Sequence, residues 1–312
     1  MKVFDKKARV IAAVDIVLFL LVVLGYTAFS GRAETKKYEK VLLPEGRAPA
    51  KILFEGLTVI ELDKRAEQWL LKDGDLDLPA DSGRVNAFLK ILSESQSMEA
   101  VAGSKASWSS LGLDGEAARS VSLFDETGYR LAYFVIGDYS VALGKLFVAF
   151  ENGDSYTMPG TLASYVKGQR SSWLDLAPWT TQPRVDEVEE FFVRGQLDDG
   201  QGSYRSFDYT IQRKMQAWEA NGIKLDTGKV EAVLRSFIAF RATDYAKSNV
   251  PFLPKLKTEL RLGNGRSMEL SLGERLEGGQ YLAASSHRTE AFYLPAWSVE
   301  ETIQPLEYFI SR

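Results

Sequence analysis

The sequence contains no cysteine and only one histidine, His287, among its 312 residues. Without cysteine the chain can form neither disulfide bonds nor thiolate metal sites. A single histidine does not supply the usual ligand set of a transition metal. Calcium or magnesium sites built from carboxylates remain possible. We therefore predict no cofactor and a protein that is stabilised by its own apolar core.

The chain also lacks an excess of positive charge. Its formal net charge is −4, whereas nucleic-acid binders usually carry a basic balance. Hydrophobic residues make up 45% and charged residues 26% of the chain, which is a globular composition with ample material for a core. We expect no nucleic-acid partner, and either one large domain or two ordinary ones.

Motifs of the common enzyme classes are missing too. The sequence has no Gly-Lys-Ser/Thr phosphate loop, no Gly-x-Ser-x-Gly elbow and no His-Glu-x-x-His helix. The densest acidic run, residues 185–192, is interpreted as the solvated face of a strand or helix. These absences predict that the chain is not an enzyme and that any nucleotide is handled by a partner.

One long apolar run is present, and no second run of this length follows it. Residues 10–29 are apolar except for Asp15, and at about 1.5 Å per residue this length spans the roughly 30 Å hydrocarbon core of a bilayer. Four basic residues precede the run, namely Lys2, Lys6, Lys7 and Arg9. The positive-inside rule then predicts a cytoplasmic tail at residues 1–9, a transmembrane anchor at 10–29 and export of the rest.

The alternative for this run is a cleaved signal peptide, with a small-residue cleavage site before Gly31. The run is longer than the roughly 7–15 apolar residues of a signal-peptide core, which favours the uncleaved anchor. Asp15 is compatible with a partner helix in the membrane or with solvation near the cytoplasmic side. We expect a single-pass protein of the cell membrane.

A nine-residue pattern occurs twice in the chain, as DSGRVNAFL at 81–89 and DTGKVEAVL at 226–234. Asp81 and Asp226 are good N-caps, because their carboxylates can accept hydrogen bonds from first-turn amides. Apolar residues follow each cap at helical spacing. The sequence therefore predicts two equivalent capped helices.

Other features recur at one fixed spacing. Gly137 and Gly273 lie 136 residues apart, and so do Pro159 and Pro295. We predict an α+β fold in which an N-terminal transmembrane helix precedes two tandem repeated units of antiparallel strands, each with one capped helix. The expected boundaries are a juxtamembrane segment at 30–49, unit 1 at 50–176, a linker at 177–184 and unit 2 at 185–312.

Two features tempt a functional interpretation. His287 lies beside Ser285 and Ser286, which suggests a base near a nucleophile, but pairing the two units places it in an exposed hairpin turn. Trp173 and Trp179 flank the linker and could form a partner-binding surface. Packing between the units explains these tryptophans as well, and we favour it.

Some motifs resemble a known family. Residues 111–114 (LGLD) and 136–138 (IGD), in the order seen here, resemble the DUF4340 family of domains of unknown function, although Gly115-Glu116 departs from its pattern. The resemblance covers residues 50–176 well and the second half more loosely. It implies a membrane anchor with a large exported part. Relatives are often encoded beside ABC-type export permeases, including an auxiliary component linked to gliding motility.

The sequence and the resemblance together suggest a single-pass, membrane-anchored extracytoplasmic binding or scaffold protein. We expect a non-catalytic accessory subunit of an ABC-type transport system, with a permease and ATPase complex as partners. One alternative is an envelope hydrolase that acts on polysaccharide or peptidoglycan through a pair of carboxylates. A further alternative is a structural spacer.

Overall fold

The computed structural model describes residues 37–310 except 117, 199, 201, 216 and 248–249. The predicted cytoplasmic tail and the transmembrane anchor at residues 10–29 lie outside the described residues. Among the residues that are described, no helix has both the length and the apolar character needed to cross a membrane.

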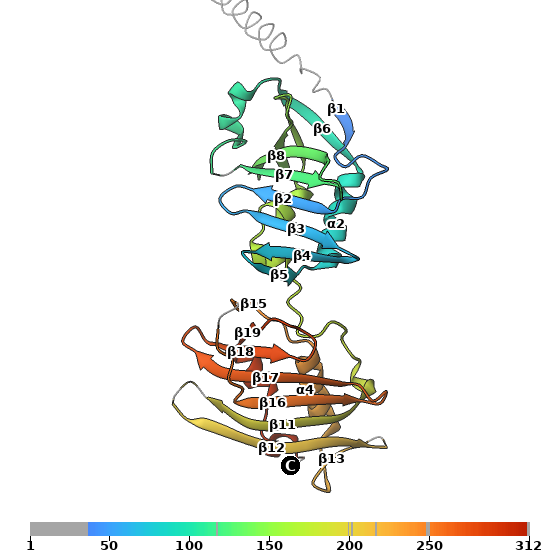
Figure 1. Cartoon of the computed structure of the whole chain (residues 1–312), viewed down its shortest axis with the longest axis vertical. Helices are drawn as coiled ribbons and strands as arrows, with labels where there is room; N and C mark the ends of the chain where they lie inside the picture. The colour runs from blue at the N-terminus through green and yellow to red at the C-terminus, as the bar shows by residue number, and fades with distance from the viewer. Residues whose placement is uncertain are drawn as a thin grey trace, which may run out of the picture.

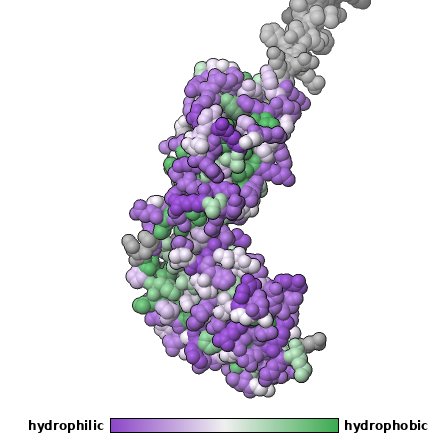
Figure 2. Space-filling model, turned by 45° about the vertical axis from the view of Figure 1, so that its right-hand side comes forward, coloured by the Kyte–Doolittle hydropathy of each residue, from purple (hydrophilic) through white to green (hydrophobic). Residues whose placement is uncertain are grey.

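Within the described ranges the chain is mostly antiparallel β-sheet with a few helices, which confirms the α+β class. One sheet belongs to residues 37–173, here called the N-lobe, and the other to residues 185–310, here called the C-lobe. The lobes follow one another along the long axis of the molecule, as Figure 1 shows. Hydrophilic residues cover most of the face seen in Figure 2.

The strands of the N-lobe sheet are β1 (Lys37–Val41), β2 (Lys51–Glu55), β3 (Ile60–Arg65), β4 (Gln68–Asp73), β5 (Leu76–Pro79), β6 (Ser95–Ala102), β7 (Arg119–Phe124), β8 (Arg130–Ser140), β9 (Lys145–Ala149) and β10 (Ser155–Pro159). Those of the C-lobe sheet are β11 (Val188–Asp198), β12 (Tyr204–Lys214), β13 (Ala217–Ala220), β14 (Ile223–Lys224), β15 (Asp244–Tyr245), β16 (Leu256–Leu262), β17 (Ser267–Leu276), β18 (Gln280–Ser285) and β19 (Phe292–Pro295).

Both sheets follow the same strand order. From one edge to the other the N-lobe runs β6-β10-β9-β8-β7-β2-β3-β4-β5, and the C-lobe runs β15-β19-β18-β17-β16-β11-β12-β13-β14. Each strand in this N-lobe order therefore has a counterpart at the same position in the C-lobe order. The N-lobe adds β1 outside β6.

The four α-helices of the described residues are α2 (Ser82–Ser93), α3 (Ala163–Val166), α4 (Thr227–Ile238) and α5 (Ala296–Thr302). Short 3₁₀ turns are η1 (Lys105–Ser107), η2 (Ser109–Leu111), η3 (Gly160–Leu162), η4 (Arg170–Trp173), η5 (Val185–Glu187) and η6 (Leu306–Phe309).

The two predicted capped helices are confirmed as α2 and α4. The carboxylate of Asp81 accepts from the backbone N–H of Arg84 at 2.9 Å, and that of Asp226 accepts from the N–H of Lys229 at 3.1 Å. Each helix buries the face that carries its apolar stripe, with buried residues Val85, Phe88 and Leu92 in α2 and Val230, Val233, Leu234, Phe237 and Ile238 in α4. Capping and periodicity therefore act together in both lobes.

The start of each capped helix is also bound by the end of its own lobe. The N–H of Asp81 donates to the carbonyl of Trp173 at 2.8 Å, and the N–H of Asp226 donates to the carbonyl of Phe309 at 2.8 Å. An isolated antiparallel bridge follows in both places, Ala80 with Leu174 and Leu225 with Ile310. The residues at the end of each lobe or directly after it thereby close the lobe against the helix N-terminus.

The glycine pair at the 136-residue spacing marks an equivalent irregularity in both sheets. The register of β8 with β9 shifts just after Ile136, and that of β17 with β18 shifts just after Leu272. A Cβ added to Gly137 would lie 2.4 Å from the carbonyl oxygen of Leu111, whereas a Cβ added to Gly273 would lie 3.4 Å from its nearest neighbours. Gly137 therefore allows the η2 segment to contact the sheet backbone directly.

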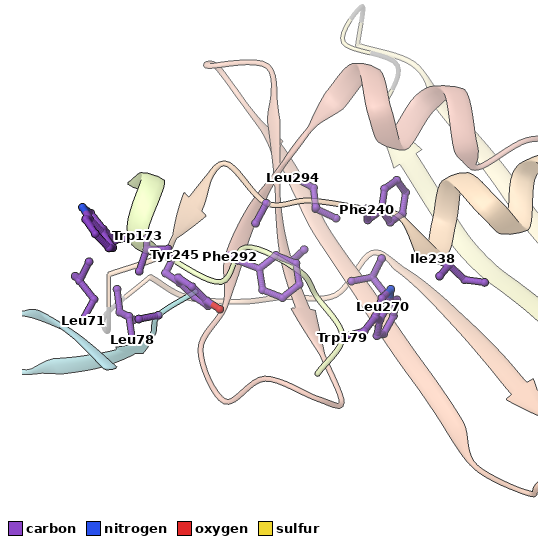
Figure 3. Close-up of a cluster of buried hydrophobic side chains, with 14 of the residues drawn as sticks. Leu71, Leu78, Trp173, Trp179, Ile238, Phe240, Tyr245, Leu270, Phe292 and Leu294 are labelled. Atoms are coloured by element: carbon purple, nitrogen blue, oxygen red, sulfur yellow. The ribbon is translucent and has the colours of Figure 1, made fainter. Parts of the chain in front are cut away.

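Most buried apolar side chains form one continuous cluster that runs through both lobes, and a small second cluster contains Leu113, Val135 and Ala149. Figure 3 shows part of the continuous cluster, with Trp173 beside Leu71 and Leu78 of the N-lobe, and Tyr245 and Phe292 between that group and the rest of the C-lobe core. The apolar packing thus does not stop at the junction.

We predict that Gly137→Ala destabilises the protein by about 1–3 kcal/mol, because the new methyl group would overlap a backbone carbonyl that cannot rotate away. Gly273→Ala is the matched control, since its added Cβ makes only ordinary van der Waals contacts. Urea unfolding of both variants measures the difference, and equal stabilities would contradict this account of the glycine.

Candidate functional site

Trp173 and Trp179, which could form a partner-binding surface but for which we favour packing, are 0% and 2% exposed. The ring of Trp173 packs against Phe54 and Phe88 of its own lobe, with centroid distances of 5.0 and 5.6 Å. The ring of Trp179 packs against Phe237 in the C-lobe at 5.5 Å. Each ring therefore fills the core of one lobe.

His287 lies in the turn after β18, and it is half-buried rather than exposed. Its ring stands edge-on to Trp179, and its Nδ1 lies 3.2 Å from the hydroxyl of Thr180. The nearby serine hydroxyls have other partners: that of Ser285 donates to the carbonyl of Pro178, and that of Ser286 accepts from the N–H of Glu269. The arrangement is structural and does not form a nucleophile–base pair.

A depression lies on the open face of the N-lobe sheet and is here called the outer groove. Its volume is about 760 Å³, within the roughly 300–1,000 Å³ range of small-ligand sites. The lining residues are Ala50, Lys51, Leu53, Asp63, Lys64, Arg65, Ala66, Phe124, Asp125, Glu126 and Gly128. They come from β2 and the residue before it, from β3 and the β3–β4 turn, and from the end of β7 and the β7–β8 turn.

Strand alternation places the floor of the groove. In β2, Ile52 and Phe54 point into the core and are fully buried, so Lys51 and Leu53 point to the opposite face. Leu53 and Phe124 are half-buried and supply apolar surface there. The result is a partly apolar floor on a sheet face that is otherwise polar.

The rim of the groove carries charges of both signs, and most of its basic groups already have partners. Lys51 pairs with Glu61 at 2.6 Å, Arg65 pairs with Asp77 at 2.6 Å, and Lys64 pairs with Glu67 at 3.4 Å. These pairs are partly exposed and add little to stability. They can exchange for charges on a bound partner at low cost.

Asp125 organises the β7–β8 turn at one end of the groove. Its carboxylate accepts from the hydroxyl and the N–H of Thr127 and from the N–H of Tyr129, and it pairs with Arg47 at 3.0 Å. The hydroxyl of Thr127, followed by these other donors and Arg47, lowers the pKa of the Asp125 carboxyl. Asp125 therefore stays ionised and stabilises the β7–β8 turn as a hydrogen-bond acceptor.

The other carboxyl groups in the described residues that have a shifted pKa, those of Asp77 and Glu99, also have a lowered pKa. The side chain of Lys72 lowers the pKa of Asp77, and that of Lys145 lowers the pKa of Glu99. A general acid for sugar hydrolysis needs a raised pKa. The described residues also contain no group of three or more His, Asp or Glu side chains arranged to hold a metal ion. None of the three carboxyl groups with a shifted pKa therefore has the raised value that a general acid needs.

The equivalent face of the C-lobe differs from the outer groove in the side chains that surround its central apolar residue. Phe192 of β11 lies where the N-lobe has Leu53, but the guanidinium of Arg194 lies 5.2 Å from the centre of its ring. Arg194 also pairs with Asp208, and Arg261 pairs with Glu190. Arg194 thus lies over the ring of Phe192, whereas Leu53 lines the outer groove.

We predict that Asp125→Asn weakens the acid dependence of stability. Because the folded-state pKa of Asp125 lies below its unfolded value of about 3.9, its contribution is present above that pH and is lost as pH falls through the folded-state pKa. The urea midpoint of the parent should therefore fall more steeply on acidification than that of Asp125→Asn. Glu126→Gln in the same turn is the control, and identical acid dependence in parent and Asp125→Asn would contradict the assignment.

Comparison with known proteins identifies one family. A search of the curated proteins and a search of the solved structures each found no match. A family described as a domain of unknown function, DUF4340, matches residues 69–259. This range begins in β4 of the N-lobe, crosses the junction and ends in β16 of the C-lobe. The resemblance predicted from residues 111–114 and 136–138 is confirmed, and the chain belongs to the DUF4340 family.

Proposed function

We propose that this protein is a single-pass, membrane-anchored binding and scaffold protein on the outer side of the cell membrane. Residues 10–29 serve as the anchor, and the two tandem units at 50–176 and 185–312 form the extracytoplasmic part. In this proposal the protein is a non-catalytic accessory of an ABC-type transport system, and its partners are the permease and the ATPase.

The outer groove is the observation that carries the binding role. It combines an apolar floor at Leu53 and Phe124 with a rim of mixed charge, on a sheet face that is rigid because its strands are hydrogen-bonded on both sides. Protein-binding surfaces commonly have such an apolar centre and a polar rim. A preformed, rigid surface also lowers the entropy cost of binding.

The hydrolase alternative receives no support from the described residues. Asp125 is held in a turn as a carboxylate, and neither Asp77 nor Glu99 has the raised pKa of a general acid. The spacer alternative leaves the outer groove without a role. A binding scaffold uses both the groove and the length of the two lobes.

The test is purification of the full chain from detergent-solubilised native membranes. We predict that the protein remains with the membrane fraction after a carbonate wash, and that permease and ATPase subunits accompany it at near-stoichiometric yield. Release by carbonate would contradict the anchor. Absence of any transporter subunit at near-stoichiometric yield would contradict the accessory role.

A pair of variants tests the groove. Leu53→Arg places a charge on the apolar floor, and loss of a central apolar contact of this kind costs at least about 2 kcal/mol, or roughly 30-fold in affinity. Thr210→Arg on the C-lobe face is the control, at the strand position equivalent to Glu61. We expect recovery of partner subunits to fall for Leu53→Arg alone, provided that both variants keep the melting temperature of the parent. Equal recovery from both would remove the groove from the interface.

A further inference from the structure

The segment between the two lobes is short and is attached at both ends by buried tryptophans. Trp173 fills the N-lobe core and Trp179 fills the C-lobe core. Figure 3 shows the two rings on opposite sides of the junction, with Tyr245 and Phe292 between them. Only residues 174–178, here called the strap, connect the two anchored positions.

The backbone of the strap is hydrogen-bonded to both lobes. On the N-lobe side, Leu174 forms a bridge with Ala80, and the N–H of Asp175 donates to the carbonyl of Pro79 at 2.9 Å. On the C-lobe side, the N–H of Ala242 donates to the carbonyl of Leu176 at 2.8 Å. Each of these bonds removes rotational freedom that a flexible linker would keep.

Asp175 binds the C-lobe through two groups. Its carbonyl accepts from the hydroxyl of Tyr245 at 2.7 Å, and its carboxylate pairs with Arg288. The side chain of Arg288 is 4% exposed, and its Nε donates to the carbonyl of Ala177 at 3.0 Å. A guanidinium buried to this degree strongly disfavours losing its partners, because the charge would remain without compensation.

A second arginine connects the lobes directly. Arg170 of η4 in the N-lobe pairs with Asp73 of the same lobe at 2.7 Å and with Asp244 of the C-lobe at 2.9 Å. Both guanidinium–carboxylate contacts have hydrogen-bond geometry, and the contact with Asp244 uses both carboxylate oxygens. Arg170 therefore fixes the distance between β4 and β15.

We propose that Arg170 and Arg288 lock the two lobes in one relative orientation, and that the strap acts as a rigid connection instead of a hinge. Arg288 fixes the strap to the C-lobe, and Arg170 fixes the C-lobe to the N-lobe beside it. The extracytoplasmic part is then one rod, in which a load or a contact on one lobe moves the other. This inference concerns the body of the protein and is independent of the identity of any partner.

The experiment measures the distance between the lobes by pulsed electron spin resonance on the full chain in nanodiscs. Because the chain has no cysteine, Asn86→Cys on α2 and Ser236→Cys on α4 introduce the only labelling sites. Both positions are exposed. We expect one narrow distance distribution for this labelled parent, and at least a twofold broader one when Arg170→Gln and Arg288→Gln are added together.

Arg184→Gln is the matched control, since Arg184 is 79% exposed and pairs with Asp186 two residues away. It is expected to leave the distribution narrow. A broad distribution in the labelled parent, or an unchanged width in the double variant, would overturn the lock. If Arg288→Gln prevents folding, as judged by circular dichroism, Asp175→Asn replaces it, because it removes the charge partner of Arg288: broadening then supports the lock, and an unchanged width contradicts it.

Discussion

The structure depends on the burial of two tryptophans that are six positions apart in the sequence but belong to different lobes. Trp173 and Trp179 each pack against the phenylalanines of one core, and truncation of such a residue typically costs about 3–5 kcal/mol. Since both ends of the strap are held in this way, the chain between them has little length to spare. The short strap already restricts the relative orientation of the two lobes. The hydrogen bonds of the strap and the two arginines, Arg170 and Arg288, then fix that orientation.

Repetition explains most of the remaining architecture. The same strand order, the same capped helix and the same closing bridge occur in both lobes. The lobes differ where they face solvent. In the C-lobe Arg194 covers the ring of Phe192, whereas in the N-lobe Leu53 and Phe124 line an open groove. A repeated scaffold with one modified face suits a protein that binds through one unit and positions itself through both.

The features that could be predicted from the sequence are local ones. An N-cap followed by an apolar stripe specifies a helix within a dozen residues, so Asp81 and Asp226 were sufficient to place α2 and α4. The family was recognisable from short motifs around Gly112 and Gly137. Packing of Trp173 and Trp179 was favoured from the sequence, but the core that each ring enters was not predictable, because it depends on which strands and helices surround the ring. The outer groove could not be predicted either, because it depends on which face of the sheet Leu53 occupies and on the register of β2 with β7. The contact of Arg288 with Asp175 was not predictable because the two residues are 113 positions apart in the sequence.

Hydrogen exchange of the strap, measured by mass spectrometry on the full chain, tests the central claim most directly. The amides of Leu174 and Asp175 donate to the carbonyls of Ser171 and Pro79, and the amide of Ala242 donates to the strap itself. If the lobes form one body, the amide of Ala242, whose bond joins the C-lobe to the strap, exchanges about as slowly as the amides of the central strands of either sheet. Exchange at the rate of an unstructured peptide, while both sheets stay protected, would show that the lobes move independently.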